Sequence, residues 1–471
     1  MSRQNGDLGL RNDSFDFPVP VIVIGGGACG CIAALAAKEA GADVLLIEQD
    51  ARPMGSTGMS QGLICAAGTK AQAAHDIADD GVTFLSDIMT KTRGLADPVI
   101  ARTIAFESGP TVDWLIDELR LPWTLDTRFR PSYGNTTYRV HGWSGHGGQD
   151  MVDLLHQRLS EAGIDVLLQA RLTDIFTDPG GLVRGIAVAR PDGAVEQIGC
   201  DALILASGGF AANHDMVARY LPEMTKARNN GHEGSQGIAV TLGQRLGAAL
   251  GDMGAYQGYG MLTEPQGISL PPGILYEGGV IVNVAAHRFV DESEDVAGIV
   301  IPVLAQAGDH VWVVFDDQIE QACSHIPETR MLIELGAAKL GASADELAAR
   351  IGVDPSALSA TLAEAAAAQG AGKPDQFGRV WGNDRPPSPP LRALKVVGAL
   401  YHTQGGLQID SDARVLRPDG STMPNLFAGG GAARSVSGPS SWGYLPAMGL
   451  CTAVTLGRLA GRSAARQVLQ A

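Results

Sequence analysis

The 471-residue chain is poor in aromatic residues and in positive charge. Aromatics make up 5% of it, and 35 Lys and Arg stand against 51 Asp and Glu, a formal net charge of −16. Without a basic excess the chain has no face that would release counterions from phosphates, so nucleic acid is not an expected partner. An anionic membrane surface is disfavoured for the same reason.

Cysteine pairs and long apolar runs are also missing. The six cysteines are scattered and form no CxxC pair, which indicates reduced thiols and no metal or iron–sulfur site. No apolar run approaches 18 residues, so we expect no membrane span. Residues 1–17 lack the apolar region of a secretory signal, and we read them as a loose tail of a cytoplasmic protein.

What the chain does contain is a glycine fingerprint between Val21 and Glu48. The letters VIVIGGGACG predict a short apolar strand that ends in Gly25-x-Gly27-x-x-Gly30 and opens an alanine-rich helix. A second strand, DVLLIE, stops on Glu48, where an acid can accept hydrogen bonds from a ribose. This order of strand, glycines, helix, strand and acid predicts a dinucleotide site with its pyrophosphate at the helix N-terminus.

The segment 52–70, RPMGSTGMSQGLICAAGTK, is too rich in small residues for a regular element. Coming after the second strand, it is suited to wrap a cofactor with backbone N–H groups and the hydroxyls of Ser56, Thr57, Ser60 and Thr69. The alternative for each hydroxyl is a turn residue that bonds its own backbone.

Several segments together resemble the flavoprotein family that contains fumarate reductase and succinate dehydrogenase flavoprotein subunits, urocanate reductase and 3-ketosteroid dehydrogenases. The matching segments run from about residue 21 to residue 466 and are VIVIGGGACG with Glu48, the wrap at 55–68, HGWSGHGGQDMVDLL, LILASGGF, HEGSQGI, AHRFVDE, YHTQGGLQID and LFAGGG…GYLPAMGL…GRLAG.

The resemblance implies an α/β protein. It would have a Rossmann-like, glutathione-reductase-type FAD domain in two parts and an inserted α+β capping domain. We therefore expect a tail at 1–17, the first part of the FAD domain at 18–250, the capping domain at 251–398 and the second part of the FAD domain at 399–471. One dinucleotide fingerprint with two further strand-to-glycine segments, Ala206–Gly209 and Ala428–Gly431, also favours FAD over a nicotinamide cofactor.

By this resemblance the fingerprint glycines hold the pyrophosphate, Glu48 binds the ribose, the wrap lies along the flavin and Ala170 approaches the adenine. The cofactor-binding residues so implied are Gly25, Gly27, Ala28, Gly30, Glu48, Gln49, Gly55, Ser56, Thr57, Ser60, Gly62, Ala170, Ala206, Ser207, Gly208, Gly430, Met448, Gly449 and Leu450.

The departures from the family are informative. Members with covalent FAD carry a histidine in the wrap, whereas GSTGMSQG has none, so we expect non-covalent FAD. Fumarate reductases carry arginines in the segment that reads RFVDESEDVAG here and at the position of Tyr444, and a histidine where this chain has Tyr259. Without two arginine forks a dicarboxylate is poorly held. The histidine of the HTxGG motif remains as His402.

GYLPAMGLCTAVTLGRLAG is most similar to 3-ketosteroid dehydrogenases of the 4,5-bond type, whose tyrosine coincides with Tyr444, although Pro446 replaces their serine. Hydride transfer beside a ketone needs an electrophile at the carbonyl oxygen and an acid or base at the next carbon. We expect Tyr444 and His402 to bind the oxygen and a cap tyrosine to carry the proton, Tyr259 with Tyr256 and Tyr276 as alternatives. The expected substrate is a small uncharged ketone, with an external electron donor or acceptor.

Two other functions stay open: reduction of an enoate or carboxylic acid, as in fumarate reductases, and an electron-transfer flavoprotein subunit without turnover of its own. Direction and oligomeric state are also open. His141 and His146 could point at the pocket, but we read them as bonded loop histidines, and we read the acids Asp291, Glu292, Glu294 and Asp295 as a solvated turn.

Overall fold

The computed structural model describes residues 15, 17–293, 296–382 and 384–470, so the expected tail lies almost wholly outside the described residues. Contacts divide the chain into two compact units. The first contains Met1–Leu221, Gly231–Tyr256 and His402–Ala471, and the second contains Pro222–Asn230 and Gln257–Tyr401. The main changeovers thus fall a few residues beyond the expected 250/251 and 398/399, and a short early segment belongs to the second unit.

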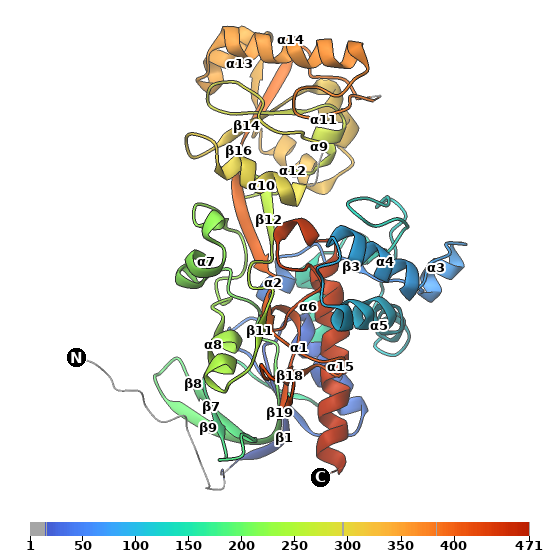
Figure 1. Ribbon diagram of the computed structural model, residues 1–471, viewed down its shortest axis with the longest axis vertical. Helices are drawn as coiled ribbons and strands as arrows, with labels where there is room; N and C mark the ends of the chain where they lie inside the picture. Colours follow the sequence, from blue (N-terminus) through green and yellow to red (C-terminus); the bar gives the residue numbers. More distant parts are fainter. Residues whose placement is uncertain (1–14, 16, 294–295, 383, 471) are drawn as a thin grey trace, which may run out of the picture. The chain divides into compact units, whose positions relative to one another are not determined.

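The first unit is built on a mainly parallel sheet of eight strands (Figure 1). Its order is β18-β19-β9-β1-β2-β6, with β8 paired to β9 and β7 to β8. The central strand β1 ends in four fully apolar, buried residues, which is the composition of a parallel strand covered on both faces. The strands are β1 (Pro18–Ile24), β2 (Val44–Ile47), β6 (Asp165–Leu167), β7 (Arg171–Thr177), β8 (Val183–Ala189), β9 (Val195–Leu205), β18 (Arg414–Leu416) and β19 (Thr422–Ala428).

Helix α1 (Ala28–Glu39) packs closely on α15 (Met448–Gln470), and Figure 1 shows the two side by side. Small residues permit this approach. A Cβ on Gly457 would lie 2.4 Å from the carbonyl oxygen of Cys29, and one on Gly461 would lie 2.1 Å from that of Ala33. The packing of α15 on α1 therefore brings the C-terminal segment of the chain against the helix that follows the glycine fingerprint.

Shorter elements complete the first unit. The strands β3, β5 and β4 form a three-stranded sheet, and β11 pairs with β17. The helices are α2 (Gly55–Gly58), α3 (Lys70–Ala74), α4 (Gly81–Lys91), α5 (Pro98–Asp117), α6 (Gly148–Glu161), α7 (His214–Tyr220) and α8 (Ile238–Arg245), with 3-10 turns η2 (Gly430–Ala432) and η3 (Ser441–Gly443). The strands are β3 (Ile64–Cys65), β4 (Thr124–Leu125), β5 (Val140–Gly142), β11 (Leu250–Gly251) and β17 (Gly406–Leu407).

The second unit has its own six-stranded sheet, ordered β10-β16-β14-β13, with β12 and β15 also on β16. Successive side chains of β14 point to opposite faces of the sheet and so contribute to two apolar cores. Val311, Val313 and Phe315 belong to one core, and Trp312 and Val314 belong to the other. The strands are β10 (Arg228–Asn229), β12 (Tyr256–Thr263), β13 (Val280–Val282), β14 (Val311–Asp316), β15 (Lys339–Gly341) and β16 (Leu391–Thr403). The helices are η1 (Pro222–Met224), α9 (Gly273–Tyr276), α10 (Val296–Leu304), α11 (Asp317–Cys323), α12 (Pro327–Glu334), α13 (Ala344–Ile351) and α14 (Pro355–Ala371).

The acidic segment of the second unit corrects one expectation. Glu292 is fully buried. Its carboxylate accepts two hydrogen bonds from Arg288, at 2.8 and 2.6 Å, and one from Arg379 at 3.2 Å. The prediction of a solvated turn is therefore wrong for Glu292, because two guanidinium groups replace its water. Asp291 is partly exposed, and Glu294 and Asp295 lie outside the described residues.

No helix in the described ranges combines the length and the apolar character needed to cross a membrane.

Candidate active site

The turn between β1 and α1 is closed by backbone contacts that leave no space for side chains. Gly25 has a φ of +110°, and a Cβ on it would lie 2.4 Å from the carbonyl oxygen of Ala206. A Cβ on Gly30 would lie 1.8 Å from the carbonyl oxygen of Gly25. Gly27 is the N-cap of α1 and supplies no side-chain cap. The positively polarised end of the helix therefore has no cap from its own N-cap residue, which suits a phosphate.

Glu48 follows β2 and braces this turn. Its Oε2 accepts the N–H of Gly26 at 2.6 Å, and its Oε1 accepts the N–H of Asp50 at 2.8 Å. The residue is 6% exposed. An ionised carboxylate offers about four lone-pair positions, so these two bonds leave acceptor capacity for the ribose hydroxyls assigned to Glu48 by the resemblance.

The hydroxyl of Thr57 in the wrap after β2 reaches the fingerprint helix, and those of Ser60 and Thr69 do not. Thr57 Oγ1 accepts the N–H of Ala28 at 3.0 Å. Ser60 Oγ donates to the carbonyl oxygen of Thr57 at 2.7 Å and accepts the N–H of Gly62 at 3.1 Å, so it braces its own turn. Thr69 caps α3 and contacts Nε2 of His141 at 2.9 Å, away from the fingerprint.

Three neighbouring parallel strands end at this edge of the sheet. After β9, Ala206 leads to Ser207, whose Oγ is buried and has no hydrogen-bond partner among the described residues. After β19, Gly430 has a φ of +57°, and a Cβ on it would lie 3.1 Å from Cβ of Cys29. A glycine cradle that side chains would fill, together with an unpaired buried hydroxyl, fits a dinucleotide at the carboxyl ends of the strands.

The remaining residues implied by the resemblance surround this edge. The N–H of Ala170 donates to the carbonyl oxygen of Glu48 at 2.9 Å. Gln49 donates from Nε2 to the carbonyl oxygen of Gly234 at 3.4 Å. Gly55, Gly62 and Gly208 all adopt positive φ angles, between 57° and 75°, as expected at tight turns where glycine carries no Cβ penalty.

Helix α15 begins beside two polar rings. The rings of His402 and Tyr444 lie edge to face, with centroids 5.7 Å apart. Tyr444 Oη accepts the N–H of Gly449 at 3.4 Å. A Cβ on Gly449 would lie 2.6 Å from Nε2 of His402. The structure thus brings together two of the three expected catalytic side chains and the expected helix start at Met448, Gly449 and Leu450.

Both rings are uncharged at neutral pH. Loss of hydration lowers the pKa of His402 to about 4, and burial raises the pKa of Tyr444 above its usual value. Gln404 Nε2 lies 3.2 Å from Nε2 of His402, and Ser437 donates to Oε1 of Gln404 at 3.2 Å. In this arrangement Nε2 of His402 accepts and Nδ1 carries the proton. Nδ1 is buried and has no partner among the described residues, so it is a donor that a ligand oxygen can use.

Gln404 was not predicted from the sequence. It is two residues after His402, and this spacing places both on one side of an extended segment, which is a signal that the YHTQGG motif contains.

Tyr259, the third expected catalytic residue, belongs to the second unit. Its hydroxyl donates to the carbonyl oxygen of Leu270, and its ring stacks on Tyr401 with centroids 5.4 Å apart. Burial raises the pKa of Tyr259 well above its usual value. In the structure this hydroxyl therefore has a backbone partner, unlike Nδ1 of His402.

A family model described as an FAD binding domain matches residues 20–443. The fumarate reductase (cytochrome) of Shewanella frigidimarina is 29% identical over 454 residues, which is 95% of this chain and 77% of that protein. The open conformation of a flavocytochrome c3 fumarate reductase superposes with a TM-score of 0.84 at 28% identity, covering 97% of this chain and 79% of that one.

The 3-ketosteroid-Δ4-(5α)-dehydrogenase of Rhodococcus jostii RHA1 superposes with a TM-score of 0.79 at 23% identity and covers 96% and 98% of the two chains. These likenesses confirm the suspected family and the α/β fold class. The chain belongs to this FAD binding domain family and is an FAD-dependent oxidoreductase.

Proposed function

We propose that the enzyme forms or reduces a carbon–carbon double bond conjugated to a ketone, on a 3-ketosteroid or another cyclic ketone. The observation that carries the proposal is the uncharged pair of His402 and Tyr444 at the start of α15. When bound, FAD supplies an acceptor or donor of hydride at its N5 atom. The residues that would hold it are the fingerprint glycines, Glu48, Thr57 and the α15 helix start.

The chain's own part is to polarise the carbonyl and to move one proton. The Nδ1–H of His402 and the hydroxyl of Tyr444 are neutral donors in a desolvated site, where hydrogen bonds to developing negative charge are strongest. In the direction of double-bond formation, the carbon next to the carbonyl loses a proton while the following carbon loses a hydride. Reduction reverses both transfers.

Tyr259 is proposed as the group that carries this proton, in either direction. To accept or deliver a proton its hydroxyl would have to leave the carbonyl oxygen of Leu270. That exchange of partners is part of the proposal.

Charge favours a ketone over a dicarboxylate. The guanidinium of Arg139 is already bound by Asp79 and Asp87, and that of Arg434 by Asp97 and Asp252. A carboxylate needs a cation that is not already neutralised in this way. A neutral carbonyl oxygen needs donors only, and His402 and Tyr444 supply them.

The second candidate is an enoate reductase, which the 29% identical fumarate reductase favours. The third, an electron-transfer flavoprotein subunit, would hold FAD and leave small ketones and acids unchanged. All three candidates require the FAD site and differ only in the molecule that exchanges electrons with the flavin.

An anaerobic flavin titration separates the three. The oxidised holoenzyme is mixed with a saturated 3-ketosteroid, with cyclohexanone or with succinate, and the photoreduced holoenzyme with the matching enones or with fumarate. The proposal expects the oxidised band to bleach with a saturated ketone or to return with an enone. A response to succinate or fumarate alone would favour the enoate reductase, and no response to any compound would favour the electron-transfer protein.

A further inference from the structure

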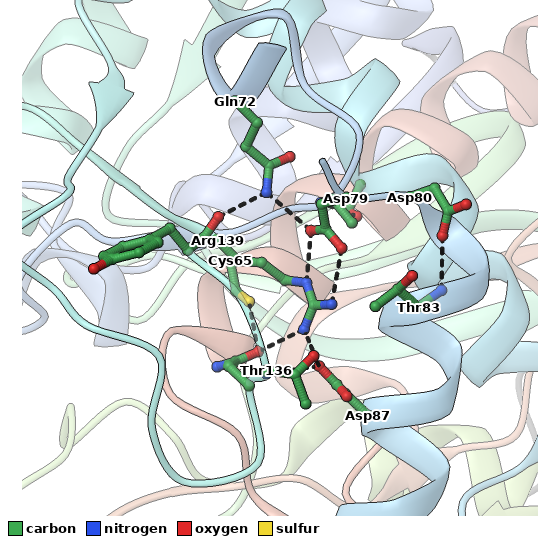
Figure 2. A network of polar contacts seen from close by, with 12 residues as sticks. Cys65, Gln72, Asp79, Asp80, Thr83, Asp87, Thr136 and Arg139 are labelled. Carbon is green, nitrogen blue, oxygen red and sulfur yellow. Dashed lines mark hydrogen bonds and ion pairs between the residues drawn. The ribbon is translucent and has the colours of Figure 1, made fainter. Parts of the chain in front are cut away.

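A buried ionic cluster surrounds Arg139, the residue directly before β5. Arg139 has a fully buried side chain. Its Nε and Nη2 bind the two oxygens of Asp79 at 2.8 and 2.9 Å, and its Nη1 binds Asp87 and, at 3.2 Å, Oδ1 of Asn135. Figure 2 shows the guanidinium between these groups, with Gln72 donating to Asp79 at 2.9 Å.

The cluster continues to β3 through two contacts. The thiol of Cys65 donates to Oδ1 of Asn135 at 3.7 Å, the same oxygen that accepts from Arg139. The N–H of Ala66 donates to the carbonyl oxygen of Arg139 at 3.0 Å. The segment that carries Arg139 therefore holds β3 in place through the Cys65 side chain and through the backbone of Ala66, which follows the strand.

From β3 the contacts reach the helix start at the site. The N–H of Cys65 donates to the carbonyl oxygen of Ala447 at 3.4 Å. Ala447 has a φ of +59°, a conformation that costs energy for a residue with a Cβ and persists where the surroundings impose it. Ala447 lies between Tyr444 and Gly449 in the sequence. The N–H of Gly449 donates to the hydroxyl of Tyr444.

The composition of the cluster does not suggest a purely stabilising role. One guanidinium is buried with two carboxylates, and buried ion pairs of this kind are often no better for stability than apolar residues of the same volume. They fix geometry well, because a bidentate pair allows one arrangement of both partners. The cluster joins the neighbouring helices α3 and α4 to the 135–139 segment, which is distant from them in the sequence, and to one short strand next to the site.

We propose that Arg139 is a positioning residue that acts through Cys65 and Ala447 to hold the Tyr444 hydroxyl and the first turn of α15 in place. Its bearing on catalysis rests on the proposed role of Tyr444. The positioning itself is independent of the substrate, and the test is chosen accordingly.

The test compares Arg139→Lys with Arg288→Lys in the holoenzyme. Both arginines are buried and bind two carboxylates, and Arg288 is in the second unit with Glu292 and Asp375. Lysine keeps the charge and loses the bidentate fork. For Arg139→Lys we expect amide hydrogen exchange in 444–451 to speed up by about tenfold or more while FAD stays bound. For Arg288→Lys we expect exchange in this segment to stay within about twofold of the wild type.

Equal exchange in 444–451 for Arg139→Lys and the wild type would overturn the proposal, and so would an equal acceleration in both variants. Neither result involves a substrate, so the outcome is separate from the fate of the ketone proposal. If a ketone bleaches the flavin, the bleaching rate constant should also fall in Arg139→Lys.

A milder pair of variants covers the case in which Arg139→Lys does not fold. Cys65→Ala removes the donor to Asn135, and Cys65→Ser keeps one. We expect faster exchange in 444–451 for Cys65→Ala and restoration by Cys65→Ser. If exchange in this segment does not differ between the two variants, Cys65 does not transmit the position of Arg139 and the proposal fails.

Discussion

The imidazole of His402 and the phenol of Tyr444 meet at an interplanar angle of 75°, with ring centroids 5.7 Å apart. His402 comes from the end of β16 and Tyr444 from the turn before α15, so the two donors come from different elements of the first unit. Edge-to-face contact is a favoured arrangement of aromatic rings. The Nδ1 of His402 has no partner among the described residues, which is why we propose this pair as the binding site for a carbonyl oxygen of the ligand.

Replacing Tyr444 by phenylalanine removes one of these donors and little volume. We expect the rate constant of flavin bleaching by a responsive ketone to fall by about 10²-fold, the usual cost of losing a donor to developing charge, with FAD content unchanged. Anaerobic stopped-flow measurement of the flavin band checks this. Tyr220→Phe is the matched control, because Tyr220 packs on Phe210 in the same unit. A change within about twofold for Tyr444→Phe would remove the electrophilic role.

Replacing Gly30 by alanine tests the fingerprint itself. A Cβ here would lie 1.8 Å from the carbonyl oxygen of Gly25, which forces α1 away from β1. We expect Gly30→Ala to be recovered without FAD or not to fold, as judged by the flavin-to-protein absorbance ratio and circular dichroism. Gly370→Ala is the control, because nothing lies within 4 Å of the added Cβ there and the residue is inside α14. It should keep full FAD content, and loss of FAD in both variants would contradict the argument.

The attachment of FAD is a separate prediction. By the resemblance, members with covalent FAD carry a histidine in the wrap at 55–62, and this segment contains no histidine here. We expect acid precipitation to release all of the flavin into the supernatant, measured by its absorbance and fluorescence. Flavin that remains in the pellet after washing and runs with the denatured chain in gel electrophoresis would contradict this prediction.

The parts of the site that could be predicted from the sequence are those made by neighbours in the chain. The approach of Gly30 to the carbonyl oxygen of Gly25 needs only a strand and a helix that follow one another, and the spacing of the glycines predicts it. The bond from Gly26 to Glu48 spans a single βαβ unit. Such local geometry follows from residue type and spacing.

The rest depends on contacts between distant segments. Asp79, Asp87 and Asn135 meet at Arg139 only after α4 and β5 have packed, and no periodicity in the sequence indicates that meeting. The prediction for Glu292 was wrong in part for the same reason: Arg288 is only four residues away, but Arg379, which binds the same carboxylate, is 87 residues further along the chain. A charged residue looks solvated until the fold brings its partner.

The two histidines with lowered pKa make stability depend on pH in a defined window. Burial and loss of hydration lower the pKa of His141 and of His402 to about 4 in the folded protein, whereas an unfolded histidine titrates near 6.5. Between these values the unfolded chain binds protons at the two histidines that the folded chain does not, so their contribution to the free energy of unfolding falls as the pH falls from about 6.5 to about 4. The slope is about 1.4 kcal/mol per pH unit for each histidine, and above pH 6.5 neither contributes.

Urea unfolding of the wild type and of His402→Asn at pH 7, 6 and 5 measures this slope, and the variant should lose about half of the histidine contribution to it. Identical slopes for the two proteins would show that His402 titrates normally in the folded state.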